Sequence, residues 1–149
     1  MNILIVGGGL QALSVARSLK KERYSVIALL HRGDISTKSK YIDELYTIDI
    51  TPTYKKEYLS SVHRVLQVHA ISVIIPLSDV TAEFLSIHKV NLEHEYHLKC
   101  AIPNYDIFQK ANDKWQLMDL CKENFIPHPR TQLLTSSNLQ EAAGAIGFP

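Results

Sequence analysis

Three consecutive glycines, Gly7 to Gly9, stand between an apolar run and a segment whose apolar residues recur at helical spacing. With Ala12 they fit the pattern G-x-G-x-x-A. Glycine in this pattern permits a tight turn and lets the amides at the start of a helix face an anion. The pattern is compatible with a dinucleotide, with another anionic ligand, or with a purely structural turn from strand to helix.

The residues near the end of the second predicted strand bear on the dinucleotide interpretation. An NAD site needs an acidic residue there, about 20 residues beyond the glycines, to hold the ribose hydroxyls. This sequence has His31-Arg32 at that place, and the first acid, Asp34, follows Gly33. Arg32 can contact the extra phosphate of NADP, hold a substrate carboxylate, or be an exposed loop residue. An NADP-binding oxidoreductase and a ligand-sensing module therefore remain alternatives.

Ser78 and Asp79 form a second polar pair, directly after the apolar run that ends at Pro76-Leu77. Either residue can cap a following helix by accepting hydrogen bonds from its first amides. The ends of parallel strands also meet at the edge of the sheet where ligands bind. The two residues are therefore candidates for a substrate cleft, and the helix cap stays an alternative explanation.

Metal and thiol chemistry have weaker support. His94, His97 and Cys100 are spaced three apart, but the segment leads into a strand-like run and has no evident fourth ligand for zinc. Cys100 and Cys121 are too few for a disulfide framework. We assign no catalytic residue and no metal ligand in this chain.

Short β-rich runs alternate with amphipathic segments, which predicts an α/β fold with an open, Rossmann-like parallel sheet flanked by helices. The strands are expected at 2–6, 25–30, 44–48, 72–76 and 100–102, and the helices at 10–22, 54–69 and from 78 or 79 to about 90. After residue 112 we expect a helix at 113–124, a strand at 131–134 and a helix capped by residues 136–138. The apolar stripe from Trp115 to Phe125 is expected to be a core face.

Composition limits the function classes. The 149 residues are 46% hydrophobic and 21% charged and carry a formal net charge of +1. This balance gives no support to nucleic-acid or membrane-surface binding, and no apolar run approaches the about 20 residues of a membrane span. We expect a soluble, cytoplasmic protein.

The order of several motifs resembles the amino-terminal part of ATP-grasp ligases, in particular the carboxylate-amine ligases and the members similar to carbamoyl-phosphate synthase. The motifs that carry the resemblance are Ile75-Pro-Leu-Ser-Asp79, Asn104-Tyr105, Asn112-Asp-Lys114, Leu120 to Glu123, Phe125-Ile-Pro-His-Pro-Arg-Thr131 and Gly147-Phe148-Pro149. Phe125 replaces the glycine that is usual in this family. The resemblance covers nearly the whole chain.

The resemblance implies that residues 1–112 form a pre-ATP-grasp domain and that residues 113–149 begin a truncated ATP-grasp domain. Lys114 then matches the lysine that reaches the nucleotide phosphates, and Gly7, Gly8, Gly9, Arg32, Ser78 and Asp79 are candidates for the substrate cleft. The implied reaction joins a small carboxylate or amino acid to an amine through an acyl-phosphate. ATP and magnesium serve the full-length parent, a homodimer is compatible, and the fragment alone is expected to be inactive and to bind no cofactor tightly.

Overall fold

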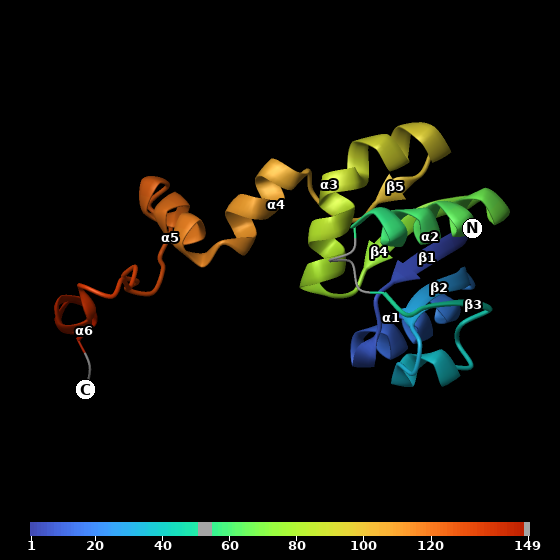
Figure 1. Cartoon of the computed structure of the whole chain (residues 1–149), viewed down its shortest axis with the longest axis horizontal. Coiled ribbons are helices and arrows are strands. Elements are labelled where there is room, and N and C mark those ends of the chain that lie inside the picture. Colours follow the sequence, from blue (N-terminus) through green and yellow to red (C-terminus); the bar gives the residue numbers. More distant parts are fainter. Residues whose placement is uncertain (51–54, 148–149) are drawn as a thin grey trace. The chain divides into compact units, whose positions relative to one another are not determined.

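The computed structural model describes residues 1–50 and 55–147. Contacts divide the chain into two units, Met1–Tyr105 and Asp106–Pro149. In the first unit, five parallel strands form one sheet with helices on both faces (Figure 1). The predicted open parallel α/β sheet is therefore confirmed. The domain boundary predicted after residue 112 was placed from sequence motifs and not from contacts, and it stays a prediction.

The strands of the first unit are β1 (Asn2–Val6), β2 (Ser25–His31), β3 (Glu44–Ile48), β4 (Ile71–Pro76) and β5 (Lys99–Cys100). Its helices are α1 (Gly9–Lys21), the short 3-10 helix η1 (Ile35–Lys38), α2 (Lys55–Val68) and α3 (Asp79–Tyr96). The helix α3 continues well beyond its predicted end near residue 90, and β5 is shorter than predicted. Tyr54, the predicted start of α2, lies outside the described residues.

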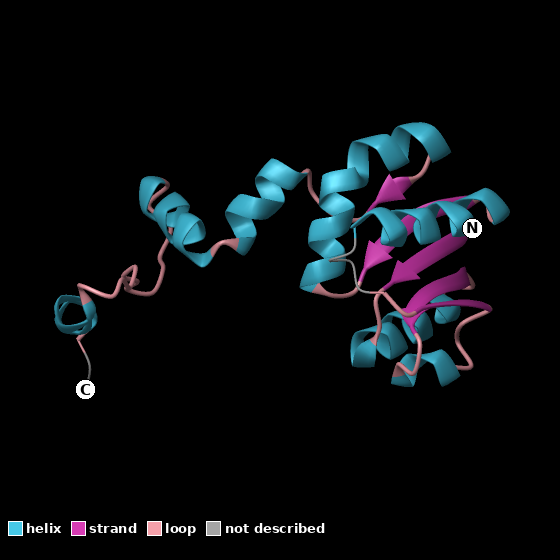
Figure 2. Cartoon of the chain, viewed as in Figure 1, coloured by secondary structure: helices cyan, strands magenta, loops and turns pink. Residues whose placement is uncertain are grey.

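The sheet has the strand order β3-β2-β1-β4-β5 (Figure 2). The chain therefore moves outward from β1 to β3 and then crosses back to place β4 on the other side of β1. In the register, Val6 pairs with Leu29 of β2 and with Pro76 of β4, so β1 and β4 end at one level, and β2 continues two residues further to His31. A reversal of this kind leaves a crevice outside the carboxyl ends of the two strands at which the order changes.

The central strands are buried on both faces, as continuous apolar runs predict. Leu4 and Val6 of β1 join a core with residues of α2 and α3, such as Val62 and Leu85. Ile5, between them, belongs to the opposite cluster with residues of β2 and α1. The α1 residues of that cluster, Ala12 and Ala16, are small and fully buried, and they let the helix lie close against the sheet.

The edge strand β5 pairs with β4 at only two register positions, and a carboxylate from α3 holds it. The Cys100 amide donates a hydrogen bond to Glu93 Oε1 (2.9 Å), and Lys89 Nζ donates to Glu93 Oε1 and to the Cys100 carbonyl (3.0 Å each). Burial raises the pKa of Glu93, but these hydrogen bonds and the Lys89 charge outweigh it and leave the pKa below its usual value. The carboxylate is therefore ionised and ties α3 to the last strand.

The second unit contains α5 (Lys114–Glu123) and α6 (Leu139–Ile146), and α4 (Tyr105–Asn112) begins at the last residue of the first unit. Asp113 caps α5, because its Oδ1 accepts hydrogen bonds from the amides of Trp115 (2.9 Å) and Gln116 (3.0 Å). Among the described residues of the whole chain, no helix combines the length and the apolar composition that crossing a bilayer requires.

Three predictions for the second unit are wrong. Residues 131–134 are not a strand: within the described chain no strand pairs with them, and an unpaired strand gains no ladder hydrogen bonds. The stripe from Trp115 to Phe125 buries no residue fully, so it is not a core face of the described chain. Asn138 precedes α6, but its side chain binds back to the Thr135 amide and the Leu133 carbonyl rather than capping the helix.

Phe125 adopts a left-handed backbone conformation, with φ of 55°, directly after Asn124, the residue that caps the end of α5. The Phe125 amide donates to the Lys122 carbonyl (3.2 Å) and the Ile126 amide to the Cys121 carbonyl (2.9 Å). This pair of bonds is the helix-ending motif that favours glycine at the left-handed position. The Phe125 side chain is 95% exposed, so packing within the described chain does not offset the backbone strain.

We predict that Phe125→Gly stabilises the second unit by about 1 kcal/mol, because glycine adopts the left-handed conformation without steric cost. Phe125→Ala is the matched control, since it removes the same ring but keeps the Cβ that causes the strain. Thermal unfolding and hydrogen exchange of the α5 amides measure the effect. Equal stabilities of the alanine and glycine variants would contradict this reading.

Candidate functional site

An open hollow of about 670 Å³ lies where β1 and β4 end. Its walls come from the glycine loop, the first turns of α1 and the junction of β4 with α3. The lining residues are Gly8, Gln11, Val15, Ile75, Pro76, Leu77, Ser78, Asp79 and Ala82. The structure thus brings the predicted Gly8, Ser78 and Asp79 together, at the crevice where the strand order reverses.

The start of α1 is occupied by a carboxylate of the same chain. The Gly9 amide donates hydrogen bonds to both carboxylate oxygens of Asp34, at 3.0 and 2.9 Å. Asp34 Oδ1 also accepts from the Ser36 amide (2.8 Å) and from the Ser36 hydroxyl, and Ser36 is fully buried. One carboxylate therefore meets the amino-terminal ends of both α1 and η1.

Sequence reasoning did not assign Asp34 this role. It asked only whether an acid at the end of β2 could hold a ribose, and it found His31-Arg32 there; the first acid after β2, Asp34, instead turns back onto the glycine loop. The sequence feature that indicates this turn is Gly33. Its φ of 82° lets the chain reverse after β2, so that Asp34 lies next to the glycine loop.

Gly8 and Gly7 are glycines for different reasons. Gly8 has a φ of −126°, which any residue adopts, but a Cβ at this position would overlap the Asp34 carboxylate. Gly7 has a φ of 95°, and a Cβ there would lie 3.2 Å from Thr81 Oγ1 at the start of α3. The loop is thus fitted between Asp34 on one side and α3 on the other.

The electrostatics favour an ionised Asp34. Partial burial raises the pKa of its carboxyl group, but the hydrogen bonds from Ser36 and Gly9, together with the nearby His31, lower it further than burial raises it. The net pKa lies below the usual value. The positive ends of two helix dipoles act in the same direction.

Ser78 is the cap of α3. The Thr81 amide donates to Ser78 Oγ (3.3 Å), and the Ser78 amide donates to Thr81 Oγ1 (3.0 Å), which forms a reciprocal capping box. Asp79 lies in the first turn of α3 and is exposed at the hollow. The cap interpretation therefore accounts for Ser78, and Asp79 is an exposed acidic residue that lines the hollow.

Arg32 directly follows β2 and does not line the hollow. Its Nε donates to Asp49 Oδ1 at 2.8 Å, and both side chains are exposed. The ion pair joins the ends of β2 and β3, where the Arg32 amide also donates to the Ile48 carbonyl (2.9 Å). A surface ion pair of this kind contributes about 0–1 kcal/mol, so a ligand anion can compete for Arg32 at small cost.

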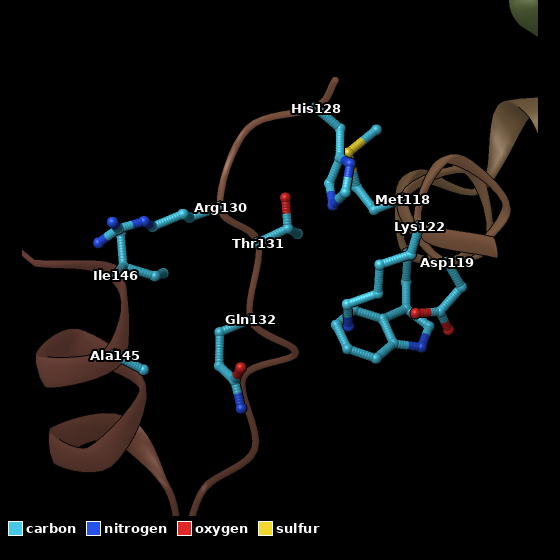
Figure 3. A pocket seen from close by; sticks show the side chains of 10 residues that line it. Met118, Asp119, Lys122, His128, Arg130, Thr131, Gln132, Ala145 and Ile146 are labelled. Atoms are coloured by element: carbon cyan, nitrogen blue, oxygen red, sulfur yellow. The ribbon is translucent and has the colours of Figure 1, made fainter. Parts of the chain in front are cut away.

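The second unit has a hollow of its own, of about 250 Å³ (Figure 3). Figure 3 shows Met118, Asp119 and Lys122 of α5 on one side and Arg130 with Ile146 on the other. The lining residues are Trp115, Met118, Asp119, Lys122, His128, Arg130, Thr131, Gln132, Ala145 and Ile146. Lys114 is exposed at the first position of α5 and does not line this hollow.

His94, His97 and Cys100 do not form a metal site among residues 1–50 and 55–147. Burial raises the pKa of the Cys100 thiol to about 11, so very little reactive thiolate exists near neutral pH. His94 and His97 are exposed, whereas Cys100, the last residue of β5, is buried. No group of three or more His, Cys, Asp or Glu side chains in these described ranges could hold a metal ion.

No known family profile matches the chain. The chain is 22% identical over 143 residues to the D-aspartate ligase of Enterococcus faecium, a match that covers 91% of this chain and 33% of that protein. The chain thus spans about a third of the length of the curated relative that it matches.

Solved structures share the fold. The biotin carboxylase domain of the Hydrogenobacter thermophilus 2-oxoglutarate carboxylase, a dimer in complex with MgADP, ADP and bicarbonate, is similar with a TM-score of 0.71 and 19% identity; the match covers 99% of this chain and 33% of that chain. The N5-carboxyaminoimidazole synthetase of Staphylococcus aureus, in complex with ADP, is similar with a TM-score of 0.69 and 20% identity, over 99% of this chain and 37% of that chain.

We predict that Gly8→Ala destabilises the first unit by about 1–3 kcal/mol, the range for forcing an extra methyl group into filled space. The cost arises from Asp34, so it should largely disappear when the same change is made in an Asp34→Ala background. Gly144→Ala is the matched control: no atom lies within 4 Å of its added Cβ, and within a helix it should stabilise by about 0.5–1 kcal/mol. Denaturant unfolding of the four variants measures these differences, and full additivity of Gly8→Ala and Asp34→Ala would contradict the clash.

The lowered pKa of Asp34 predicts a pH dependence. Its stabilising contribution is present above the unfolded-state pKa of about 3.9 and is lost as the pH falls through the lower folded-state pKa. The difference in unfolding free energy between the native chain and Asp34→Asn should therefore be largest near neutral pH and shrink below about pH 4. Asp43 and Glu93 also have lowered pKa values, but they cancel in this difference. A difference that stays constant from neutral to acidic pH would refute the role.

Proposed function

Because the chain is related to ATP-grasp ligases, we propose that it is the substrate-side portion of an ATP-dependent carboxylate-amine ligase that works through an acyl-phosphate. The observation that carries the proposal is the similarity to a D-aspartate ligase, which runs through 91% of the chain. In this reaction a carboxylate oxygen attacks the γ-phosphorus of ATP and ADP leaves. The amine then attacks the carbonyl carbon and phosphate leaves.

The hollow at the ends of β1 and β4 is the proposed place of the carboxylate substrate. Gly8, Ser78 and Asp79 line it, and it lies at the reversal of strand order, where open α/β sheets bind ligands. Asp79 is suited to the ammonium group of an amino acid, because it is an exposed acidic residue that lines the hollow. Arg32 is suited to a substrate carboxylate that extends past β2. To bind it, Arg32 would give up an exposed ion pair with Asp49, which is a weak interaction.

Residues 113–149 are proposed to begin the nucleotide-binding domain. Lys114 stands exposed at the first position of α5, and a mobile ammonium group suits phosphate oxygens there. Catalysis in such a reaction is mostly positioning and neutralisation of charge, so one lysine supplies only part of it. The described residues offer no ligand set for magnesium, and we derive no step through that ion from them.

The alternative of an NADP-binding oxidoreductase is not favoured. The relative is a ligase, and the solved structures that share the fold include a ligand-bound carboxylase and a synthetase.

We expect the chain alone to bind a small amino-acid carboxylate weakly, to bind Mg-ADP weakly, and to release no ADP from Mg-ATP. Titration with D-aspartate should shift the amide signals of Gly8, Ser78 and Asp79 in NMR spectra. Mg-ADP should instead shift signals at the start of α5. Lys114→Gln should weaken the Mg-ADP response, whereas the matched change Lys110→Gln on another exposed helix position should not. Micromolar binding of NADPH, or steady ADP production, would overturn the proposal.

The coding sequence beyond codon 149 supplies an independent check. The proposal expects a strand with a lysine within a few residues and, further on, an acid-x-Asn pair. A stop codon at the same place would contradict it.

A further inference from the structure

The glycine loop and the start of α1 have the shape of an anion site. Gly7 and Gly9 have φ values of 95° and 80°, which turn the chain so that α1 begins immediately after β1. The first amides of a helix lack carbonyl partners and lie at the positive end of the helix dipole. Such a start attracts phosphate groups in many α/β proteins.

In this chain the Asp34 carboxylate occupies the start of α1. Hydrogen bonds within the loop after β2 also hold Asp34 in place. The Asp34 amide donates to the His31 carbonyl (3.1 Å), and the Thr37 hydroxyl donates to the Asp34 carbonyl (2.7 Å). The buried Ser36 donates twice to the carboxylate from within η1. The loop after β2 therefore delivers the carboxylate as a preformed part of the fold.

The loop is also shaped for this particular carboxylate. At Gly8 the backbone conformation is open to any residue, and the space that a side chain would take is filled by Asp34. A second anion at the Gly9 amide would share its donor with Asp34 and would stand within a few Å of a like charge. Two negative charges at such a short separation repel each other.

We propose that Asp34 is a specificity-determining residue: its carboxylate is the resident anion of the glycine loop and excludes phosphate groups from the start of α1. The loop then serves as a rigid wall of the neighbouring hollow and not as a phosphate cradle. This inference is independent of the ligase proposal, because it concerns only which ligand chemistry the loop rejects.

Inorganic pyrophosphate is the probe, and the Gly9 amide signal in NMR spectra is the readout. In the native chain, pyrophosphate should leave this signal in place. In Asp34→Ala, the Gly9 signal should move on titration, with binding at least about tenfold tighter than in the native chain, the factor that corresponds to 1.4 kcal/mol. Asp34→Asn keeps the shape and removes the charge, so its affinity should fall between the other two.

Asp43→Ala is the matched control. Asp43 also accepts from a backbone amide, that of Val26 at 2.8 Å, but it pairs with Lys20 in the last turn of α1 rather than with the start of the helix. This variant should bind pyrophosphate no better than the native chain. The proposal fails if the native chain shows the same Gly9 shift and affinity as Asp34→Ala, or if neither Asp34 variant gains affinity. If Asp34→Ala does not fold, Asp34→Asn and the native titration still decide.

Discussion

The hydrogen bonds from Gly9 to Asp34 are the constraint on which the geometry of the crevice depends. They join residues 25 positions apart and fix the loop after β2 against the start of α1. With Asp34 in place, position 8 has no room for a side chain, and position 7 is pressed against the first turn of α3. The Asp34 carboxylate thus holds the glycine loop in position. Because Gly8 of this loop lines the hollow at the ends of β1 and β4, the carboxylate also fixes one wall of that hollow.

Sheet topology supplies the rest of the site. The central strands present apolar residues to both faces, so the polar groups of this region collect where the strands stop. The order β3-β2-β1-β4-β5 puts the reversal between β1 and β4, and the residues that follow these two strands are the ones that line the hollow. The capping box at Ser78 then turns the chain at once into α3 and leaves Asp79 exposed beside the opening.

The parts of this structure that local patterns determine could be predicted from the sequence. The apolar runs from 2 to 6 and from 72 to 76 identify central strands, and the polar pair after the second run marks a helix start. The seating of Asp34 could not be predicted in this way, because it depends on a tertiary contact across 25 residues. Residues 131–134 read as a strand, but strand formation needs a pairing partner that a local pattern does not contain. The apolar stripe from Trp115 to Phe125 likewise predicts a buried helix face, but the pattern does not identify the element that would cover it.

The hold of Glu93 on β5 has a mechanical consequence. The chain continues from β5 toward residue 105, and this stretch is attached to the sheet by the pairing of β5, by the Ala101 amide, which donates to the Ile74 carbonyl (2.8 Å), and by the Glu93 carboxylate. Lys89, one turn earlier in α3, donates to the same carboxylate and to the Cys100 carbonyl, so two side chains of one helix hold β5. The pairing of β4 with β5 is much shorter than that of β4 with β1, so loss of the Glu93 carboxylate would loosen the edge of the sheet and leave the strands that border the crevice paired.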